Sequence, residues 1–299
     1  MTRPTLFLLS GVLLVLGWTA CSLGPNTSAL EPESRDFYAK ARLVMAEAEK
    51  EIFLHLPDAA SRRDFVADFW AKRDPDLSTE ANEFQDEFER RVEHANLRFN
   101  DGRKGMDTDR GRIYIYLGPP DKTEEFPFST STEIRGPILW WIYYWFELGI
   151  SFADVRNTGV YKIYEIEGNL LDAIERSKLG AVNQSWGTGG PYLDFDVTYD
   201  RSKKALVAAI PVKTETIVDD NGRWKANFAF TFYIYKNKAP REKVVEERSY
   251  ETPVSALDRE RKVVFEFPYD LPPGKTYLDV ILTGPKTLGQ ARKIFTLKN

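Results

Sequence analysis

The chain of 299 residues has very little cysteine and histidine, with one cysteine, Cys21, and two histidines, His55 and His94. One cysteine cannot form an internal disulfide, and two distant histidines without a second cysteine cannot complete a usual zinc set. Signatures of a serine-nucleophile elbow and of a phosphate-binding glycine loop are also missing. The sequence therefore predicts no metal site, no cofactor and no catalytic residues.

An excess of positive charge is missing as well. The chain carries 41 Lys and Arg against 45 Asp and Glu, a formal net charge of −4. Because nucleic-acid binding calls for a clustered basic face, we expect no nucleic-acid partner. Hydrophobic residues make up 42% and aromatic residues 13% of the chain, which is ample for real cores, and its length predicts two domains.

After residue 20 there is no second long apolar run, and the first one is short. Residues 1–4 include the basic Arg3, residues 6–16 are uncharged and rich in Leu and Val, and the small Ala20 precedes Cys21. The apolar core has about 11 residues, whereas a membrane-spanning helix needs about 20. This pattern predicts a cleaved secretory signal over residues 1–20.

The segment that ends at Cys21 resembles the bacterial lipobox. The resemblance implies cleavage before Cys21, acylation of the cysteine and attachment to a membrane, with residues 21–33 as a lipidated tether. Ser22 after the cysteine favours the outer membrane, with the protein facing the periplasm. The alternative is a free or buried thiol that follows an ordinary signal.

Apolar residues at spacings of three and four predict helices over residues 34–56, over 59–73 and from 78 or 79 to about 99. A period of two predicts a strand over 113–117, and further strands are expected over 138–146, 150–155 and 160–166. A short helix over 169–179 closes this part. Helical hairpins followed by a small antiparallel sheet predict an α+β domain over residues 34–180.

Residues 181–191 are rich in Gly, Asn and Ser and are predicted to be a linker. Over residues 192–299 the pattern predicts strands alone, at about 193–199, 205–212, 223–236, 243–251, 262–267, 276–283 and 290–297. Seven short strands in roughly 100 residues favour an all-β, Ig-like sandwich. Residues 219–222 are expected to form a hairpin turn in it.

One run of residues resembles the bacterial GWxTD domain, and the resemblance spans roughly residues 65–165. It rests on Phe69, Trp70, Arg73, Asp74, Pro75, Asn82, Glu83, Arg91, Ala95, Asn96, Phe99, Gly118, Pro119, Pro120 and Asp121, and on the motif Gly105, Met106, Asp107, Thr108, Asp109, Arg110, Gly111 and Arg112. Met106 stands where the family name has tryptophan. The resemblance implies a lipoprotein signal and a β-rich C-terminal part, but no established molecular activity.

The motif at 105–112 favours a structural role. Its two glycines permit unusual backbone angles, Thr108 and Asp109 can accept from N–H groups in a turn, and Arg110 or Arg112 can pair with carboxylates from the helices. We therefore expect a buried polar latch between the helices and the first strand. The alternative is that Asp107 and Asp109 form a catalytic acid/base pair.

An aromatic cluster over residues 140–146 either packs in the core or presents Trp141, Tyr143 and Trp145 as a ligand or partner surface. The anchor, the tether and the sandwich together predict a non-enzymatic, lipid-anchored platform that binds other envelope proteins. One alternative is a glycan- or peptidoglycan-binding module that uses these aromatic residues. Another is a carboxylate-based envelope hydrolase.

Overall fold

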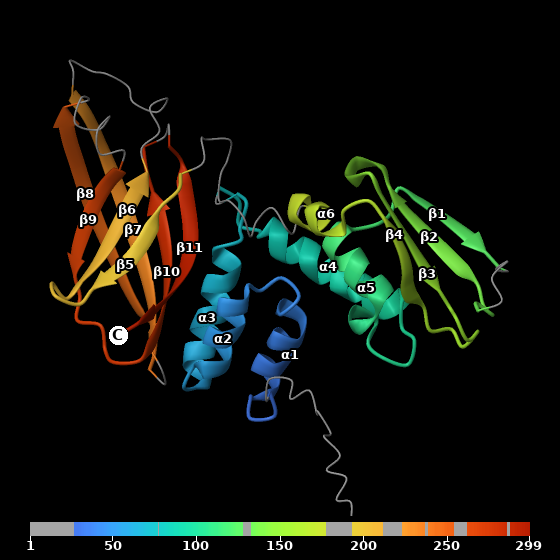
Figure 1. The fold of residues 1–299 in the computed structure, drawn as a ribbon. Helices are drawn as coiled ribbons and strands as arrows, with labels where there is room; N and C mark the ends of the chain where they lie inside the picture. Colours follow the sequence, from blue (N-terminus) through green and yellow to red (C-terminus); the bar gives the residue numbers. More distant parts are fainter. Residues whose placement is uncertain are drawn as a thin grey trace, which may run out of the picture.

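The computed structural model describes residues 27–76, 78–127, 133–177, 193–211, 223–236, 239–253, 262–285 and 288–299. A central group of helices has a four-stranded sheet of short strands, here called the small sheet, on one side and the two sheets of the C-terminal part on the other (Figure 1). The predicted signal over 1–20, Cys21, the linker over 181–191 and the turn over 219–222 lie outside the described residues. In the described part of the chain, no helix has the length and apolarity needed to cross a membrane.

Three short helices form the centre of the molecule: α1 (Pro32–Ala41), α2 (Glu47–His55) and α3 (Ala59–Ala71). The prediction of one helix over 34–56 is wrong, because the chain turns between α1 and α2. The Glu49 carboxylate accepts a hydrogen bond from the Ala46 N–H at 2.9 Å and so starts a new helix there. Helix α3 begins where the Asp58 carboxylate caps the Ser61 N–H at 2.8 Å.

Helix α4 (Glu83–Arg98) leads to a short 3-10 helix, η1 (Gly105–Asp107), and to α5 (Asp109–Leu117). The strand predicted over 113–117 is therefore wrong. Ile113 and Leu117 are buried against the small sheet, whereas Ile115 is buried against the central helices. A helix that is buried on two opposite sides shows apolar residues at every second position, which imitates the period of a strand.

The small sheet is antiparallel, in the order β1 (Lys122–Phe126), β2 (Ile138–Tyr143), β3 (Leu148–Ala153) and β4 (Lys162–Glu167). The 3-10 helix η2 (Tyr144–Phe146) joins β2 to β3, and α6 (Leu170–Arg176) follows β4. One face of the sheet packs Trp141, Ile150 and Phe152 against α5 and α6. The predicted α+β character is confirmed, although the sequence reading missed β1.

The C-terminal part contains two antiparallel sheets. The larger has the order β11 (Gln290–Lys298), β10 (Lys275–Thr283), β7 (Arg223–Lys236) and β8 (Glu242–Pro253); the smaller has β5 (Asp196–Asp200), β6 (Ala205–Pro211) and β9 (Lys262–Pro268). Alternate residues of β7, among them Phe228, Phe230 and Phe232, fill one shared core with both sheets. The seven predicted strands are confirmed, in a sandwich-like arrangement.

The central helices pack against the outer face of the larger sandwich sheet. Tyr233, Tyr235 and Tyr277 on that face belong to the same buried cluster as Phe53 and Phe65 of the helices. The outer face of this sheet is therefore covered by α2 and α3, whereas α5 and α6 pack on the small sheet at the other end of the molecule.

A network of buried ion pairs crosses this contact. Asp279 of β10 accepts from Lys72, just after α3, at 2.6 Å and from the Nε of Arg292 of β11 at 2.8 Å. Arg292 also reaches Glu49 of α2 at 2.8 Å, and Glu49 accepts from Arg73 at 2.6 Å. Five charged side chains are therefore joined directly across the contact, by pairs that are 207 and 243 positions apart in sequence.

The network changes the titration of its carboxylates. Burial raises the pKa of Glu49, but the charges of Arg73 and Arg292 more than offset this and lower it to about 2. The pKa of Asp279 is likewise held below its usual range: burial opposes this, but Arg292 and Lys72 outweigh it. Both groups are therefore charged at neutral pH and depend on their partners.

Candidate functional site: the motif loop and the adjoining groove

The two glycines of the motif allow a close approach of backbone segments. A Cβ atom on Gly105 would overlap the carbonyl oxygen of Ala95 in α4, and one on Gly111 would overlap the carbonyl oxygen of Gly105. Neither glycine has a positive φ. The expectation that they supply unusual backbone angles is therefore wrong, and what they supply is room for η1 and α5 to lie directly on α4.

Thr108 and Met106 fix the loop between these glycines. The Thr108 hydroxyl donates to the Gly105 carbonyl at 2.7 Å and accepts from the Gly111 N–H at 3.0 Å, so it caps α5. Met106 is buried in the helical core, and its N–H donates to the Asn96 side chain at 3.0 Å. The position that gives the family its tryptophan is thus a packing position in this chain.

Asp107 and Asp109 hold different partners. Asp107 accepts from an Arg42 guanidinium nitrogen at 2.6 Å. Asp109 accepts from the Ile163 N–H of β4 at 3.2 Å and lies 3.5 Å from the Lys162 ammonium. The two carboxylates tie the motif to the end of α1 and to the small sheet, respectively, and the structure does not bring them together as an acid/base pair.

The two motif arginines also differ. The Arg110 guanidinium lies over the ring of Tyr161, 4.0 Å from its centroid, and 5.5 Å from that of Phe99. Burial lowers the pKa of Arg110. Arg112 is exposed on the other side of α5. The expected latch differs in three ways: Asp107 and Asp109 are half-buried, the predicted first strand is α5, and among the described residues no carboxylate pairs with Arg110 or Arg112. The motif is instead connected to its surroundings by Asp107, Asp109 and the aromatic contacts of Arg110.

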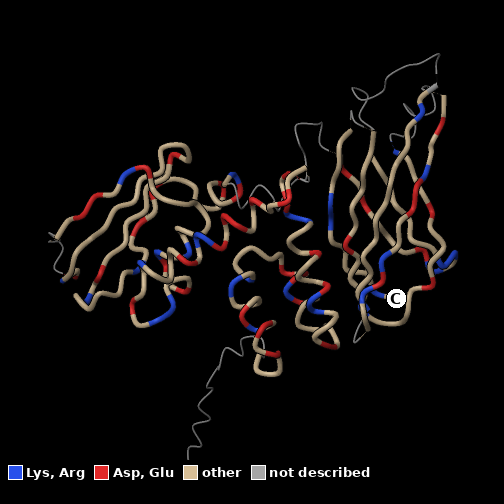
Figure 2. Tube along the Cα trace, turned by 180° about the vertical axis from the view of Figure 1, so that it is seen from behind, with Lys and Arg blue, Asp and Glu red and all other residues tan. Residues whose placement is uncertain are grey.

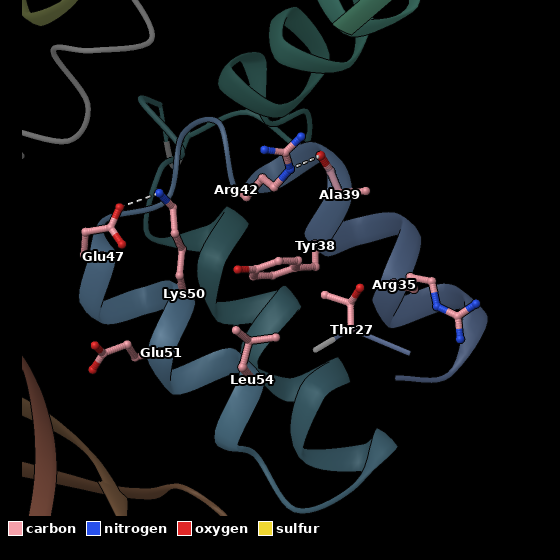
Figure 3. A pocket seen from close by; sticks show the side chains of 9 residues that line it. All are labelled: Thr27, Arg35, Tyr38, Ala39, Arg42, Glu47, Lys50, Glu51 and Leu54. Atoms are coloured by element: carbon pink, nitrogen blue, oxygen red, sulfur yellow. Dashed lines mark hydrogen bonds and ion pairs between the residues drawn. The ribbon is translucent and has the colours of Figure 1, made fainter. Parts of the chain in front are cut away.

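Arg42 leads from the motif into a groove between α1 and α2 with a volume of about 560 Å³. Figure 3 shows the Tyr38 ring across the floor of this groove, with its hydroxyl directed toward the α2 side. Burial raises the pKa of Tyr38. The groove is lined by Thr27, Arg35, Tyr38, Ala39, Arg42, Glu47, Lys50, Glu51 and Leu54. The contact between Arg42 and Asp107 connects this groove to the motif.

A second groove of about 420 Å³ lies on the other side of α1, against α3 and α4. Its floor includes Phe37, Val66, Trp70 and Phe88, and charged side chains of both signs surround it. Figure 2 shows acidic and basic residues interspersed along these helices rather than separated by sign. Among the described residues, no group of three or more His, Cys, Asp or Glu is arranged to hold a metal ion.

The predicted aromatic surface is divided by the sheet. Trp141 and Tyr143 are 3% and 2% exposed, and the Tyr143 hydroxyl donates to the Gly118 carbonyl at 3.1 Å. Trp145, in contrast, is 79% exposed on η2. The core interpretation of these strands therefore holds for Trp141 and Tyr143, and Trp145 stands alone as the exposed member of the predicted set.

The small sheet and its connections nevertheless expose much apolar surface. Of the ten large apolar side chains exposed in the described part of the chain, seven lie between residues 126 and 171. They are Phe126, Tyr144, Trp145, Val155, Tyr164, Ile166 and Leu171. Tyr144 and Trp145 belong to the aromatic cluster over residues 140–146 that the sequence singled out. Phe126, Tyr164 and Ile166 carried no signal because an edge strand and a central strand share the same period, and Val155 and Leu171 lie outside the strands.

The fold and the motif loop define a class of protein in which a central group of helices lies between a small antiparallel sheet and a sandwich-like pair of sheets. Residues 34–143, from α1 to the end of β2, match the model of the GWxTD domain family, and the chain therefore carries a GWxTD domain. Comparison with curated proteins gave no match.

Proposed function

We propose that this chain is a lipid-anchored protein of the cell envelope that binds other envelope proteins and is not an enzyme. In this proposal Cys21 carries the lipid, the protein faces the periplasm from the outer membrane, and the C-terminal sandwich is Ig-like. The single observation that carries the binding role is the exposed apolar surface of the small sheet, with Trp145 at its most exposed point.

Exposed aromatic side chains are costly in water and are enriched where proteins meet. In this chain they are concentrated at the end of the molecule that lies away from the sandwich (Figure 1). The buried ion network holds the central helices to the sandwich, and Asp109 holds the small sheet to α5. These contacts hold the surface in place relative to the helices and the sandwich, which lowers the entropic cost of binding a partner.

Glycan binding is the second candidate, and a row of side chains across the outward face of the small sheet favours it. The register places Glu124, Trp140, Ser151 and Glu165 side by side on four strands. An aromatic ring stacks on the apolar face of a sugar, and flanking carboxylates accept its hydroxyls. Ser151 is buried at the centre of this row, so a sugar would contact the other three side chains.

The hydrolase alternative has less support. Asp107 and Asp109 are each engaged with a separate basic or backbone group, as described above. If the hydrolase alternative holds, replacing both with Asn lowers polymer hydrolysis in an envelope extract while the protein stays folded. Unchanged hydrolysis removes this alternative.

The test of the leading proposal is an in-cell crosslinking pull-down of the full chain, read by mass spectrometry. Trp145→Ser with Tyr164→Ser removes two exposed rings from the small sheet, and the matched control is Leu97→Ser on α4, which is 77% exposed in the wild type. We expect envelope proteins that are recovered with the wild type and the control but not with the double variant. Equal recovery from all three contradicts the binding role of the sheet.

The anchor is tested separately. Changing Cys21 to Ala should leave an uncleaved precursor and abolish acyl labelling in cells. Labelling that persists in this variant contradicts the assignment of Cys21, without bearing on the partner surface.

A further inference from the structure

The groove between α1 and α2 has the composition of a site for an amphiphile with an anionic group. Its volume of about 560 Å³ lies within the range of small-molecule sites. Ala39, Tyr38 and Leu54 supply the apolar part of the lining, whereas Arg42 at the end of α1 and Lys50 of α2 supply positive charge. In Figure 3 the Arg42 guanidinium is directed toward the Ala39 carbonyl and the Lys50 ammonium toward Glu47. Apolar and cationic surface thus meet in one concavity.

Arg42 and Lys50 in the groove do not use all of their N–H donors in hydrogen bonds among the described residues. Arg42 donates through Nε to the Ala39 carbonyl at 3.2 Å and through one terminal nitrogen to Asp107 at 2.6 Å. Its other terminal nitrogen has no acceptor in the described part of the chain. The Lys50 ammonium has three donors and gives one to Glu47 at 2.7 Å. Arg35 donates through one nitrogen to the Leu30 carbonyl at 2.7 Å.

The two carboxylates of the groove are already engaged. Glu47 holds Lys50, and Glu51 accepts from Lys275 of β10 at 2.6 Å and from the Tyr277 hydroxyl. The lining has three cations and two carboxylates, and Asp107 adjoins it through Arg42, so the case for an anion rests on hydrogen-bond donors rather than on an excess of positive charge. Arg42 and Lys50 therefore offer free donors to an anion, whereas Glu51 is turned to the sandwich.

The position of the groove identifies the source of such an anion. Thr27, where the described chain begins, lines the groove, and it is the sixth residue after Cys21. A chain of six residues spans at most about 22 Å, so a lipid on Cys21 keeps the groove close to the bilayer surface. The anionic groups at a bilayer surface are phosphates of lipid headgroups, and each is joined to the apolar part of its lipid.

From these observations we infer that the groove between α1 and α2 binds the phosphate-bearing head of a membrane lipid. Arg42 and Lys50 contact the phosphate, and the apolar part lies on Tyr38 and Leu54. Asp107 of the motif holds one side of the Arg42 guanidinium and leaves the other side for the ligand. The lipid source rests on the proposed anchor, but the phosphate chemistry does not.

The test is calorimetric titration of the full chain in a neutral detergent at fixed ionic strength, with three probes. Dihexanoylphosphatidylglycerol reports lipid binding, inorganic phosphate reports the anion alone, and dihexanoylglycerol lacks the phosphate. The variants are Arg42→Gln and Lys50→Gln, and the control is Arg103→Gln, an exposed arginine outside the groove that pairs with Asp101. Partitioning into micelles is the same for all of these proteins and cancels in the comparison.

A charge-assisted hydrogen bond contributes enough for its loss to weaken binding about tenfold. We expect that rise in Kd for phosphatidylglycerol with each groove variant and an unchanged Kd for the control. If inorganic phosphate binds and is weakened by the same two variants, the anion site is supported. If phosphate binds in this way but phosphatidylglycerol does not, the ligand is free phosphate and not a lipid.

The inference is overturned when neither phosphate probe binds, when dihexanoylglycerol binds as well as phosphatidylglycerol, or when both groove variants bind like the wild type. Because Lys50 lies on the surface of α2, Lys50→Gln remains informative even if Arg42→Gln does not fold. A pull-down without partners leaves this titration unchanged, so the two proposals fail separately.

Discussion

Replacing Asp279 with Asn should strongly destabilise the chain. The Asp279 side chain is 3% exposed and accepts three hydrogen bonds, one from Lys72 at 2.6 Å and two from Arg292 at 2.8 and 2.9 Å. The substitution keeps the shape of the side chain but removes the negative charge between two buried cations. Both cations then remain buried with incomplete compensation.

The magnitude follows from the burial of the network. Removing one partner of a buried ion pair typically costs about 3–5 kcal/mol, because the remaining charge is left without compensation. In a chain of this size each kcal/mol lowers the melting temperature by about 2–4 °C, so a loss of about 6–20 °C is expected. Lys72→Met should cost less, because Asp279 keeps Arg292.

Circular dichroism melting of the wild type and the variants measures this effect. The matched control is Asp270→Asn, which breaks an exposed pair with Lys204 and should change the free energy of unfolding by less than about 1 kcal/mol. If Asp279→Asn melts within the range of the control, the network does not hold the helices to the sandwich and the reasoning fails.

Three further predictions concern the motif and the pH dependence. Gly105→Ala should cost more than about 3 kcal/mol in chemical unfolding, because the methyl group overlaps backbone, whereas Gly149→Ala, with ordinary contacts, should cost about 1 kcal/mol or less; equal costs would contradict the close approach. Thr108→Val removes the cap of α5 and should cost about 1–2 kcal/mol in the same assay, and no change would show that the cap is dispensable. The pKa of Glu49 falls from 4.5 to about 2 on folding, so its contribution to the free energy of unfolding is complete above pH 4.5 and is lost as the pH falls toward 2. Melting temperatures measured over this pH range should fall, and they should fall less steeply with pH in Glu49→Gln. An equal pH dependence in the two proteins would refute this.

The sandwich could be predicted well from the sequence because its strands have one buried and one exposed face. In β7, alternate residues such as Phe228, Phe230 and Phe232 enter a single core, and the period of two is undisturbed. Helix α5 could not be predicted in this way. Ile113 and Ile115 are buried in different cores on opposite sides of the helix. Their spacing of two therefore has the same pattern as the single buried face of a strand.

The turn between α1 and α2 was hidden for a related reason. Ala41 and Val44 are both buried and keep the helical spacing through the turn, while the cap that restarts α2 is a glutamate at its third residue. The ion network was also beyond reach, since Lys72 and Asp279 are 207 residues apart. The motif was recognisable from its residue types, but the need for glycine arose from backbone contacts with α4 that no local pattern contains.

The most direct test of the central claim is site-specific photocrosslinking in cells, with a photoreactive residue at position 145 or at position 97. The two native side chains are 79% and 77% exposed, so accessibility is matched and location differs. The proposed function predicts a discrete envelope-protein adduct from position 145 and none from position 97. The same adducts from both positions, or none from position 145 in a folded and anchored protein, would contradict it.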